Sequence, residues 1–207
     1  MPSSMIHLNI AYSIAKKAGI SISDMPSLIL GSVSPDAVNT GVIQAPKEIR
    51  YSAHLRDRDL KIWENNVFEY AKNCNISDKA FLLGFMIHIL TDIKWDELVQ
   101  PSMLDKIKAK NPDKDPKSIK WKTLLAFDNL LLQNENRGEI INYLKLSDPE
   151  KEISTVTKEM LTSYKKELCE RYENKKAQGD TNTVLSVCDL ELVENSVTEL
   201  LIQQGYM

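Results

Sequence analysis

The 207-residue chain lacks several patterns that mark specialised classes of protein. Its three cysteines, Cys74, Cys169 and Cys188, lie far apart and include no Cys-x-x-Cys pair, so no disulfide framework is predicted. No uncharged run reaches the roughly 18 residues that a membrane-spanning helix needs. Lys16 and Lys17 interrupt the apolar stretch near the start, which disfavours a secretory signal peptide. We therefore expect a cytoplasmic protein.

An excess of positive charge is also missing. The 26 Lys and Arg residues against 29 Asp and Glu residues give a net charge of −3. Long nucleic acid is therefore disfavoured as a partner, because no overall positive field exists to hold it by counterion release. The chain is 43% hydrophobic and 27% charged, as in ordinary globular proteins. At roughly 150 residues per domain, we predict one domain over residues 1–207.

Strand patterns are scarce, because clean alternation of apolar and polar residues is hard to find. The apolar spacing is helical nearly throughout, which predicts an all-α, single-domain bundle of many helices. Helices are expected over residues 4–17, 24–30, from about 54 or 57 to 70, 79–92, 121–133, 139–146, 148–173 and 183–203. Residues 37–51 and 177–181 are expected to be loops. The segment 101–117, with three prolines, five lysines and three aspartates, is predicted to be an exposed, lid-like loop.

Histidine is the other scarce residue, and two of the three histidines fall on predicted buried helix faces. His7 shares a face with Ala11 and Ile14. His88 and Asp92 lie four residues apart on the most apolar helix, where burial costs several kcal/mol unless each is paired or bound to a metal. Either a satisfied core pair or a ligand pair fits this spacing. Gly84, one turn earlier, leaves room for another backbone, a metal or a substrate.

Two further residues complete a candidate metal set. Asp36 ends the turn Gly-Ser-Val-Ser-Pro-Asp, and His54 lies in Tyr-Ser-Ala-His at an expected helix start. Alone, each would be read as a turn or capping residue. Together with His88 and Asp92 they make a mixed nitrogen and oxygen set that suits Zn²⁺ or another first-row divalent ion, with coordination left open for water.

In their order along the chain, these motifs resemble the zinc-dependent phospholipase C family, an all-helical fold shared with single-strand nucleases. The resemblance covers roughly the first 100 residues. It rests on a helical His7, the Leu-Gly-Ser-Val-Ser-Pro-Asp turn ending at Asp36, Ser-Ala-His54, and the helical Gly-Phe-Met-Ile-His-Ile-Leu-Thr-Asp of residues 84–92. The resemblance implies that Asp36, His54, His88 and Asp92 bind one zinc ion, and that Asp92 bridges to a second ion held by His7. No histidine follows His88, so the third zinc site of secreted members cannot be built in the same way.

Asp128 is a candidate outside the matched region. It lies in the apolar stripe formed by Trp121, Leu124 and Leu132, so its side chain is expected to face the core. A buried carboxylate needs a partner. Asp128 is either a hydrogen-bonded core residue or a contributor to the second metal.

The function that these residues favour is metal-dependent hydrolysis of phosphate esters. The expected enzyme is a phospholipase C-like phosphodiesterase that acts on a small phosphoester or a phospholipid. Its ion would activate water, and Asp36 would orient or deprotonate that water. Thr91 or a backbone carbonyl would fix an imidazole tautomer.

Two alternatives stay open. One is an intracellular nuclease or nucleotide phosphohydrolase in which Trp63, Trp95, Tyr51 or Phe81 stacks on a base. The other is a non-catalytic protein whose metal only ties helices together.

Overall fold

The computed structural model describes residues 2–40, 45–174 and 182–207, and within these ranges it contains ten α-helices and no strand. This confirms the predicted all-α class. The α-helices are α1 (Ser4–Lys17), α2 (Met25–Gly31), α3 (Lys47–Ala53), α4 (Leu60–Asn73), α5 (Lys79–Lys94), α6 (Gln100–Lys110), α7 (Pro116–Leu131), α8 (Arg137–Leu146), α9 (Lys158–Asn174) and α10 (Val187–Gln203). A 3-10 helix, η1 (Ser34–Asn39), and a single π-helical turn, η2 (Trp95–Val99), complete the described elements. None of the described helices is both long and apolar enough to cross a membrane.

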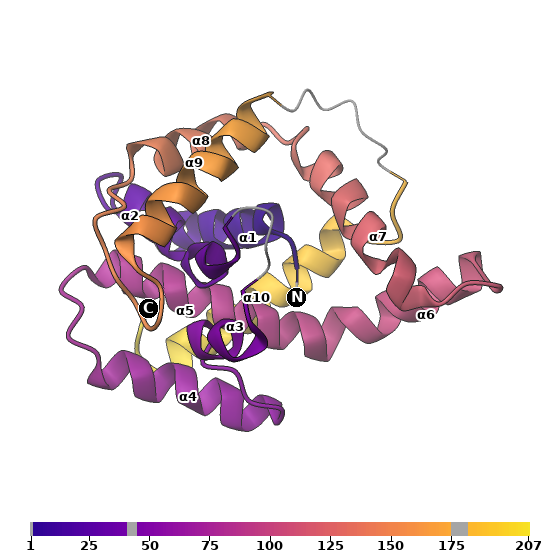
Figure 1. Cartoon of the computed structure of the whole chain (residues 1–207), viewed down its shortest axis with the longest axis horizontal. Helices are drawn as coiled ribbons and strands as arrows, with labels where there is room; N and C mark the ends of the chain where they lie inside the picture. The colour runs from indigo at the N-terminus through magenta and orange to yellow at the C-terminus, as the bar shows by residue number, and fades with distance from the viewer. Residues whose placement is uncertain (1, 41–44, 175–181) are drawn as a thin grey trace.

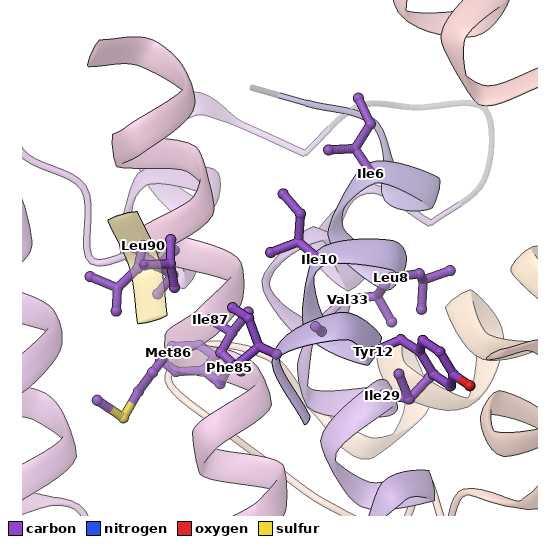
Figure 2. Close-up of a cluster of buried hydrophobic side chains, with 14 of the residues drawn as sticks. Ile6, Leu8, Ile10, Tyr12, Ile29, Val33, Phe85, Met86, Ile87 and Leu90 are labelled. Carbon is purple, nitrogen blue, oxygen red and sulfur yellow. The ribbon is translucent and has the colours of Figure 1, made fainter. Parts of the chain in front are cut away.

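Helix α5 is the centre of the bundle and packs against α1, α2, α4 and α10 (Figure 1). Its residues from Phe81 to Ile93 are all buried, as its continuous apolar run predicts. Figure 2 shows apolar side chains of α1, α2 and α5 gathered in one cluster, among them Ile10, Ile29 and Ile87. Each fully buried side chain of this size contributes about 1.5–3 kcal/mol. A helix enclosed in this way holds its polar residues in fixed positions.

Two glycines allow α2 and α5 to approach each other closely in this core. A Cβ atom placed on Gly84 would lie 2.1 Å from the carbonyl oxygen of Leu28, and one placed on Gly31 would lie 2.1 Å from that of Phe81. Only residues without side chains fit at such a crossing. The space at Gly84 is therefore filled by another backbone, which is one of the three occupants that the sequence left open.

Several local predictions are confirmed. Helix α1 has the expected bounds, and Gly19 follows it in the left-handed conformation at φ 69°. Asp78 caps α5 by accepting a hydrogen bond from the Phe81 amide at 2.9 Å. Asp128 faces the core and is 3% exposed.

Other predictions are wrong. Residues 101–117 do not form a lid-like loop, because α6 occupies most of the segment and Pro101 sits in its first turn, where a missing amide proton costs nothing. Residues 47–51 belong to α3 rather than to a loop, and His54 caps the end of α3 instead of starting the next helix. Helix α9 begins at Lys158, not near residue 148.

Trp121 also departs from expectation. It is 58% exposed, although the apolar stripe predicted burial. Of the other stripe members, Leu124 is fully buried and Leu132 is 2% exposed. The predicted loop at residues 177–181 lies outside the described residues.

Candidate metal centre

Five of the six predicted site residues come together in the core. His7 comes from α1, Asp36 from η1 and His54 from the C-terminal cap of α3. His88 and Asp92 come from successive turns of α5. We call these five residues the imidazole–carboxylate cluster.

The His88 ring contacts both of the other imidazole rings. The His7 and His88 rings are stacked, with centroids 3.7 Å apart and an interplanar angle of 10°. The His54 ring meets His88 edge-on, with centroids 5.2 Å apart. Rings this close share one small volume at the centre of the bundle.

Backbone carbonyls fix the orientation of two rings. The Nδ1 atom of His88 lies 2.8 Å from the carbonyl oxygen of Ser32, and the Nδ1 atom of His54 lies 2.8 Å from that of Arg50. A carbonyl oxygen only accepts, so both Nδ1 atoms carry protons and donate them. In the neutral rings, both Nε2 atoms then present lone pairs. A backbone carbonyl was one of the two predicted orienting groups, whereas the Thr91 hydroxyl, the other, has no hydrogen-bond partner among the described residues.

These two lone pairs point at each other. The Nε2 atoms of His54 and His88 are 3.3 Å apart. Two facing acceptors repel unless a proton or a cation lies between them. Because the Nδ1 protons are already committed, the pair can be satisfied only by an additional positive group.

The carboxylates surround the same point. His54 Nε2 lies 3.5 Å from Asp36 Oδ1 and 3.8 Å from Asp92 Oδ2. His88 Nε2 lies 3.9 Å from Asp92 Oδ2, while the other oxygen of Asp92, Oδ1, lies 3.5 Å from His7 Nε2. Asp92 therefore offers one oxygen to His54 and His88 and the other to His7.

Two overlapping groups in the cluster have the spacing of metal ligands. One contains His7, His88 and Asp92, and the other contains Asp36, His54 and His88; within each group the ligand atoms lie within 4.8 Å of one another. His88 belongs to both groups. This arrangement can accommodate one ion or two.

The protonation states favour a cation as well. Burial and the neighbouring His7 lower the pKa of the His88 imidazole to about 3, so this ring is neutral at neutral pH. Burial opposes ionisation of Asp92, but His7 and the other two imidazoles outweigh it and hold the pKa of Asp92 below its usual value. In the same way His54, with His88 and His7, lowers the pKa of Asp36 against the effect of burial. Neutral imidazoles and ionised carboxylates are the forms that bind metal.

His54 behaves differently from His88. Burial lowers its pKa, but the hydrogen bond to Asp36 and the charges of Asp92 and Asp36 reverse this effect and raise the pKa. A proton and a metal ion therefore compete for Nε2 of His54, and metal binding would release that proton.

Asp128 lies in a different environment. It accepts a hydrogen bond from the Ser3 hydroxyl and belongs to neither of the two ligand groups found in the described ranges. The structure thus places the sixth predicted residue in the core but not with the other five.

A pocket borders the imidazole–carboxylate cluster at Asp36. Its cavity of about 320 Å³ is lined by Asp36 together with Arg50, Trp121 and Arg171. The Asp36 side chain is 16% exposed, whereas those of His7 and Asp92 are fully buried. Sequence reasoning did not select Arg50 or Arg171, because neither belongs to a motif and the two lie on helices distant in the chain.

Residues proposed to stack on a base do not reach this pocket. Trp63, Trp95 and Phe81 are fully buried, so they cannot contact a ligand from solvent. Tyr51 is covered by the guanidinium of Arg56, which lies 5.4 Å from its ring centroid. Arg56 itself pairs with Asp96 at 3.2 Å.

No protein-family model, no curated protein and no solved structure matches the chain. The interpretation of the imidazole–carboxylate cluster therefore depends on its own geometry.

Proposed function

We propose that the protein is a metal-dependent hydrolase of phosphate esters, with a metal centre formed by the imidazole–carboxylate cluster. One or two zinc ions, or other first-row divalent ions, would be held by His7, Asp36, His54, His88 and Asp92. The observation that carries the proposal is the 3.3 Å separation of the Nε2 atoms of His54 and His88, whose Nδ1 protons are both directed to carbonyl oxygens.

Several buried atoms around this contact lack a hydrogen bond, and they fit a metal better than a proton. Both ring nitrogens of His7 and both carboxylate oxygens of Asp92 are buried without a hydrogen-bond partner among the described residues. Leaving such groups unsatisfied costs about 1–3 kcal/mol each, and more for charged groups. A proton on His54 would relieve one contact, whereas a divalent ion satisfies several lone pairs at once.

The chemistry of the ligands favours a catalytic ion over a purely structural one. Closed structural zinc sites are usually built with thiolates, and the cluster contains none. Asp36 also borders the pocket, so one ligand is accessible from solvent. When bound, the ion supplies Lewis acidity, which makes water more acidic and stabilises negative charge on phosphoryl oxygens.

Residues of the chain would orient the metal ligands and transfer the proton. The carbonyls of Ser32 and Arg50 hold the His88 and His54 rings with Nε2 directed inward. Asp36, ionised and exposed to the pocket, accepts the proton of the attacking water as its oxygen bonds to phosphorus and the ester P–O bond breaks. The departing oxygen takes a proton from water in the pocket.

The first test is a metal count. After reconstitution with zinc and removal of excess ion, the wild-type protein should retain one to two equivalents. His88→Ala should lose most of this metal, because His88 belongs to both ligand groups. Glu97→Gln, which changes an exposed carboxylate near the end of α5, is the control and should retain the wild-type amount. Less than about 0.3 equivalents in the wild type would overturn the proposal.

The second test is turnover by the same samples. Zinc-loaded wild-type protein should hydrolyse bis-nitrophenyl phosphate or nitrophenyl phosphorylcholine, and removal of the metal should abolish the reaction. Metal retained without hydrolysis of any phosphate ester would favour a structural ion instead.

A further inference from the structure

The pocket beside Asp36 is lined by two arginines whose side chains have no role in the proposed metal chemistry. Arg50 reaches it from α3 and Arg171 reaches it from α9. Guanidinium groups match the geometry of phosphate oxygens and bind them through paired N–H donors. The pocket therefore has the side chains needed to hold a phosphate next to the candidate metal centre.

Arg50 joins the two sites directly. Its backbone carbonyl accepts the hydrogen bond from His54 Nδ1 at 2.8 Å, while its Nε donates to the Ala45 carbonyl at 3.0 Å. The latter bond uses one of the five N–H donors of the guanidinium. A phosphate held by this side chain is thus bound by the same residue that orients a proposed metal ligand.

A residue of the same helix holds the Arg171 side chain. It forms an ion pair with Glu167, one turn earlier on α9, and Glu167 also lines the pocket. This pair engages part of the guanidinium fork and holds the side chain in place. The two arginines balance the charges of Asp36 and Glu167, and a divalent ion in the cluster makes this end of the molecule locally positive. An anionic ligand fits that charge.

Two other groups in the pocket point to a ligand. The Oδ1 atom of Asn39 is buried there without a hydrogen-bond partner among the described residues, so it needs a donor. Trp121 forms part of the wall from α7 and is 58% exposed, which leaves its indole available for contact. An indole ring binds a planar ring by stacking or a cationic group by cation–π attraction.

We propose that Arg50 and Arg171 bind the phosphate group of the substrate and that Trp121 contacts its organic part. The ligand class is a phosphate ester whose organic part carries a ring or a cationic head group. The inference rests on the proposed function, because the metal centre is taken to supply the reacting end of the pocket. It assigns substrate recognition largely to α7 and α9, which lie outside the motifs that suggested the metal site.

The test is binding of inorganic phosphate to the zinc-loaded protein, measured by calorimetry together with the metal content of each sample. Arg171→Gln and Arg50→Gln should each weaken phosphate binding about tenfold or more, since a hydrogen bond to a charged group is lost. The control Arg58→Gln removes the same charge from an exposed arginine outside the pocket and should change the affinity by less than about twofold. Arg171→Lys keeps the charge but loses the forked guanidinium, so its phosphate affinity should lie between those of Arg171→Gln and the wild type.

Trp121 is tested separately. Trp121→Ala should weaken binding of adenosine monophosphate about tenfold but leave the affinity for inorganic phosphate unchanged. Phosphatidylcholine vesicles form a parallel arm; sedimentation of the protein with vesicles in an Arg171-dependent manner would identify a lipid head group as the source of the phosphate. Binding of adenosine monophosphate without binding to vesicles would identify a soluble ester.

The outcomes separate the two proposals. Zinc retained together with unchanged phosphate affinity in both Arg171→Gln and Arg50→Gln would overturn this inference and leave the metal centre standing. Failure of the wild type to retain zinc would overturn the proposed function. Thermal unfolding of each variant shows whether it is folded, and Arg50→Gln and Arg171→Gln serve as independent variants on different helices.

Discussion

Two buried polar clusters lie close to the start of α1, and they differ in how their atoms are paired. The imidazole–carboxylate cluster contains buried nitrogens and oxygens without hydrogen-bond partners among the described residues. The second, which we call the hydroxyl cluster, consists of Ser3, Ser4, Asp128, Tyr164 and Tyr172. All five of its residues are buried, but their side chains hydrogen-bond to one another.

The hydroxyl cluster is satisfied by its own members. The Ser3 hydroxyl donates to Asp128, and the hydroxyl oxygens of Ser4 and Tyr164 are 2.8 Å apart. Burial, reinforced by the charge of Asp36, raises the pKa of Tyr164 well above its usual value, so its phenol stays neutral. Similar burial thus has two results: the polar atoms of one cluster hydrogen-bond to one another, while the other keeps buried polar atoms without hydrogen-bond partners among the described residues.

The two clusters are also mechanically linked. Ser3 precedes α1, and its carbonyl accepts a hydrogen bond from the His7 amide at 3.2 Å. The hydroxyl cluster ties this end of α1 to α7 and α9 through Asp128 and Tyr164. It therefore fixes the helix that carries His7, so Asp128 would influence the proposed metal centre only indirectly.

The largest expected effect comes from disturbing the scaffold of the imidazole–carboxylate cluster. Gly84→Ala would place a Cβ atom 2.1 Å from the Leu28 carbonyl oxygen and force α2 away from α5. We expect a loss of about 3 kcal/mol or more in the free energy of unfolding, measured by urea denaturation. Zinc retention should fall as well, because the Ser32 carbonyl that orients His88 lies at the end of α2.

Gly138→Ala is the matched control for this change. A Cβ atom at Gly138 would meet nothing within 4 Å, so alanine in α8 should be neutral or slightly stabilising. Wild-type stability and zinc content in Gly84→Ala would contradict the role assigned to the helix crossing.

Local sequence signals predicted the elements that form the core of the site. The bounds of α1 and the Asp78 cap of α5 follow from residues close together in the chain, whereas the sequence left open which of three groups approaches Gly84. The scarcity of histidine also helped, because all three histidines enter the imidazole–carboxylate cluster. Helical spacing alone was sufficient to pair His88 with Asp92.

Composition was a poorer guide where helices are short or polar. Prolines and lysines suggested a loop at residues 101–117, but Pro101 occupies a first-turn position that tolerates proline. Trp121 and Leu124 both fit an apolar stripe, and only the packing of α7 decides that Leu124 is buried and Trp121 exposed. Arg50 and Arg171 line one pocket only because tertiary packing brings α3 and α9 to it, so no local pattern could reveal the pair.

A smaller effect is expected when one carboxylate of each cluster is changed in the same way. Asp92→Asn and Asp128→Asn make the same change at two buried positions. Asp92→Asn should reduce zinc retention by about one equivalent, because it removes charge from the ligand that faces all three imidazoles. Asp128→Asn should retain the wild-type amount and cost about 1–2 kcal/mol of stability through weaker hydrogen bonding. Equal zinc loss in both variants would place Asp128 in the metal centre.

The smallest expected effect comes from Asp78, a partly exposed carboxylate that belongs to neither cluster. Asp78 accepts hydrogen bonds from Lys151, from the Phe81 amide and from the Ser27 hydroxyl. Burial opposes its ionisation, but these donors outweigh burial and lower the pKa of Asp78 below its usual value. A folded-state pKa below the unfolded-state value stabilises the protein above about pH 4, and this stabilisation disappears as the pH falls through the folded-state pKa.

Asp78→Asn keeps a side chain that caps helices well but removes the charge that attracts Lys151. We expect a cost of about 0.5 kcal/mol at neutral pH, in the range of partly exposed ion pairs. Urea denaturation of both proteins should show this difference shrinking as the pH is lowered toward about 3, where the wild-type carboxyl also becomes protonated. A difference that stays constant over this range would assign the effect to capping instead of charge. Because Asp78 is not one of the proposed metal ligands, zinc should raise the stability of the wild type and of Asp78→Asn by the same amount.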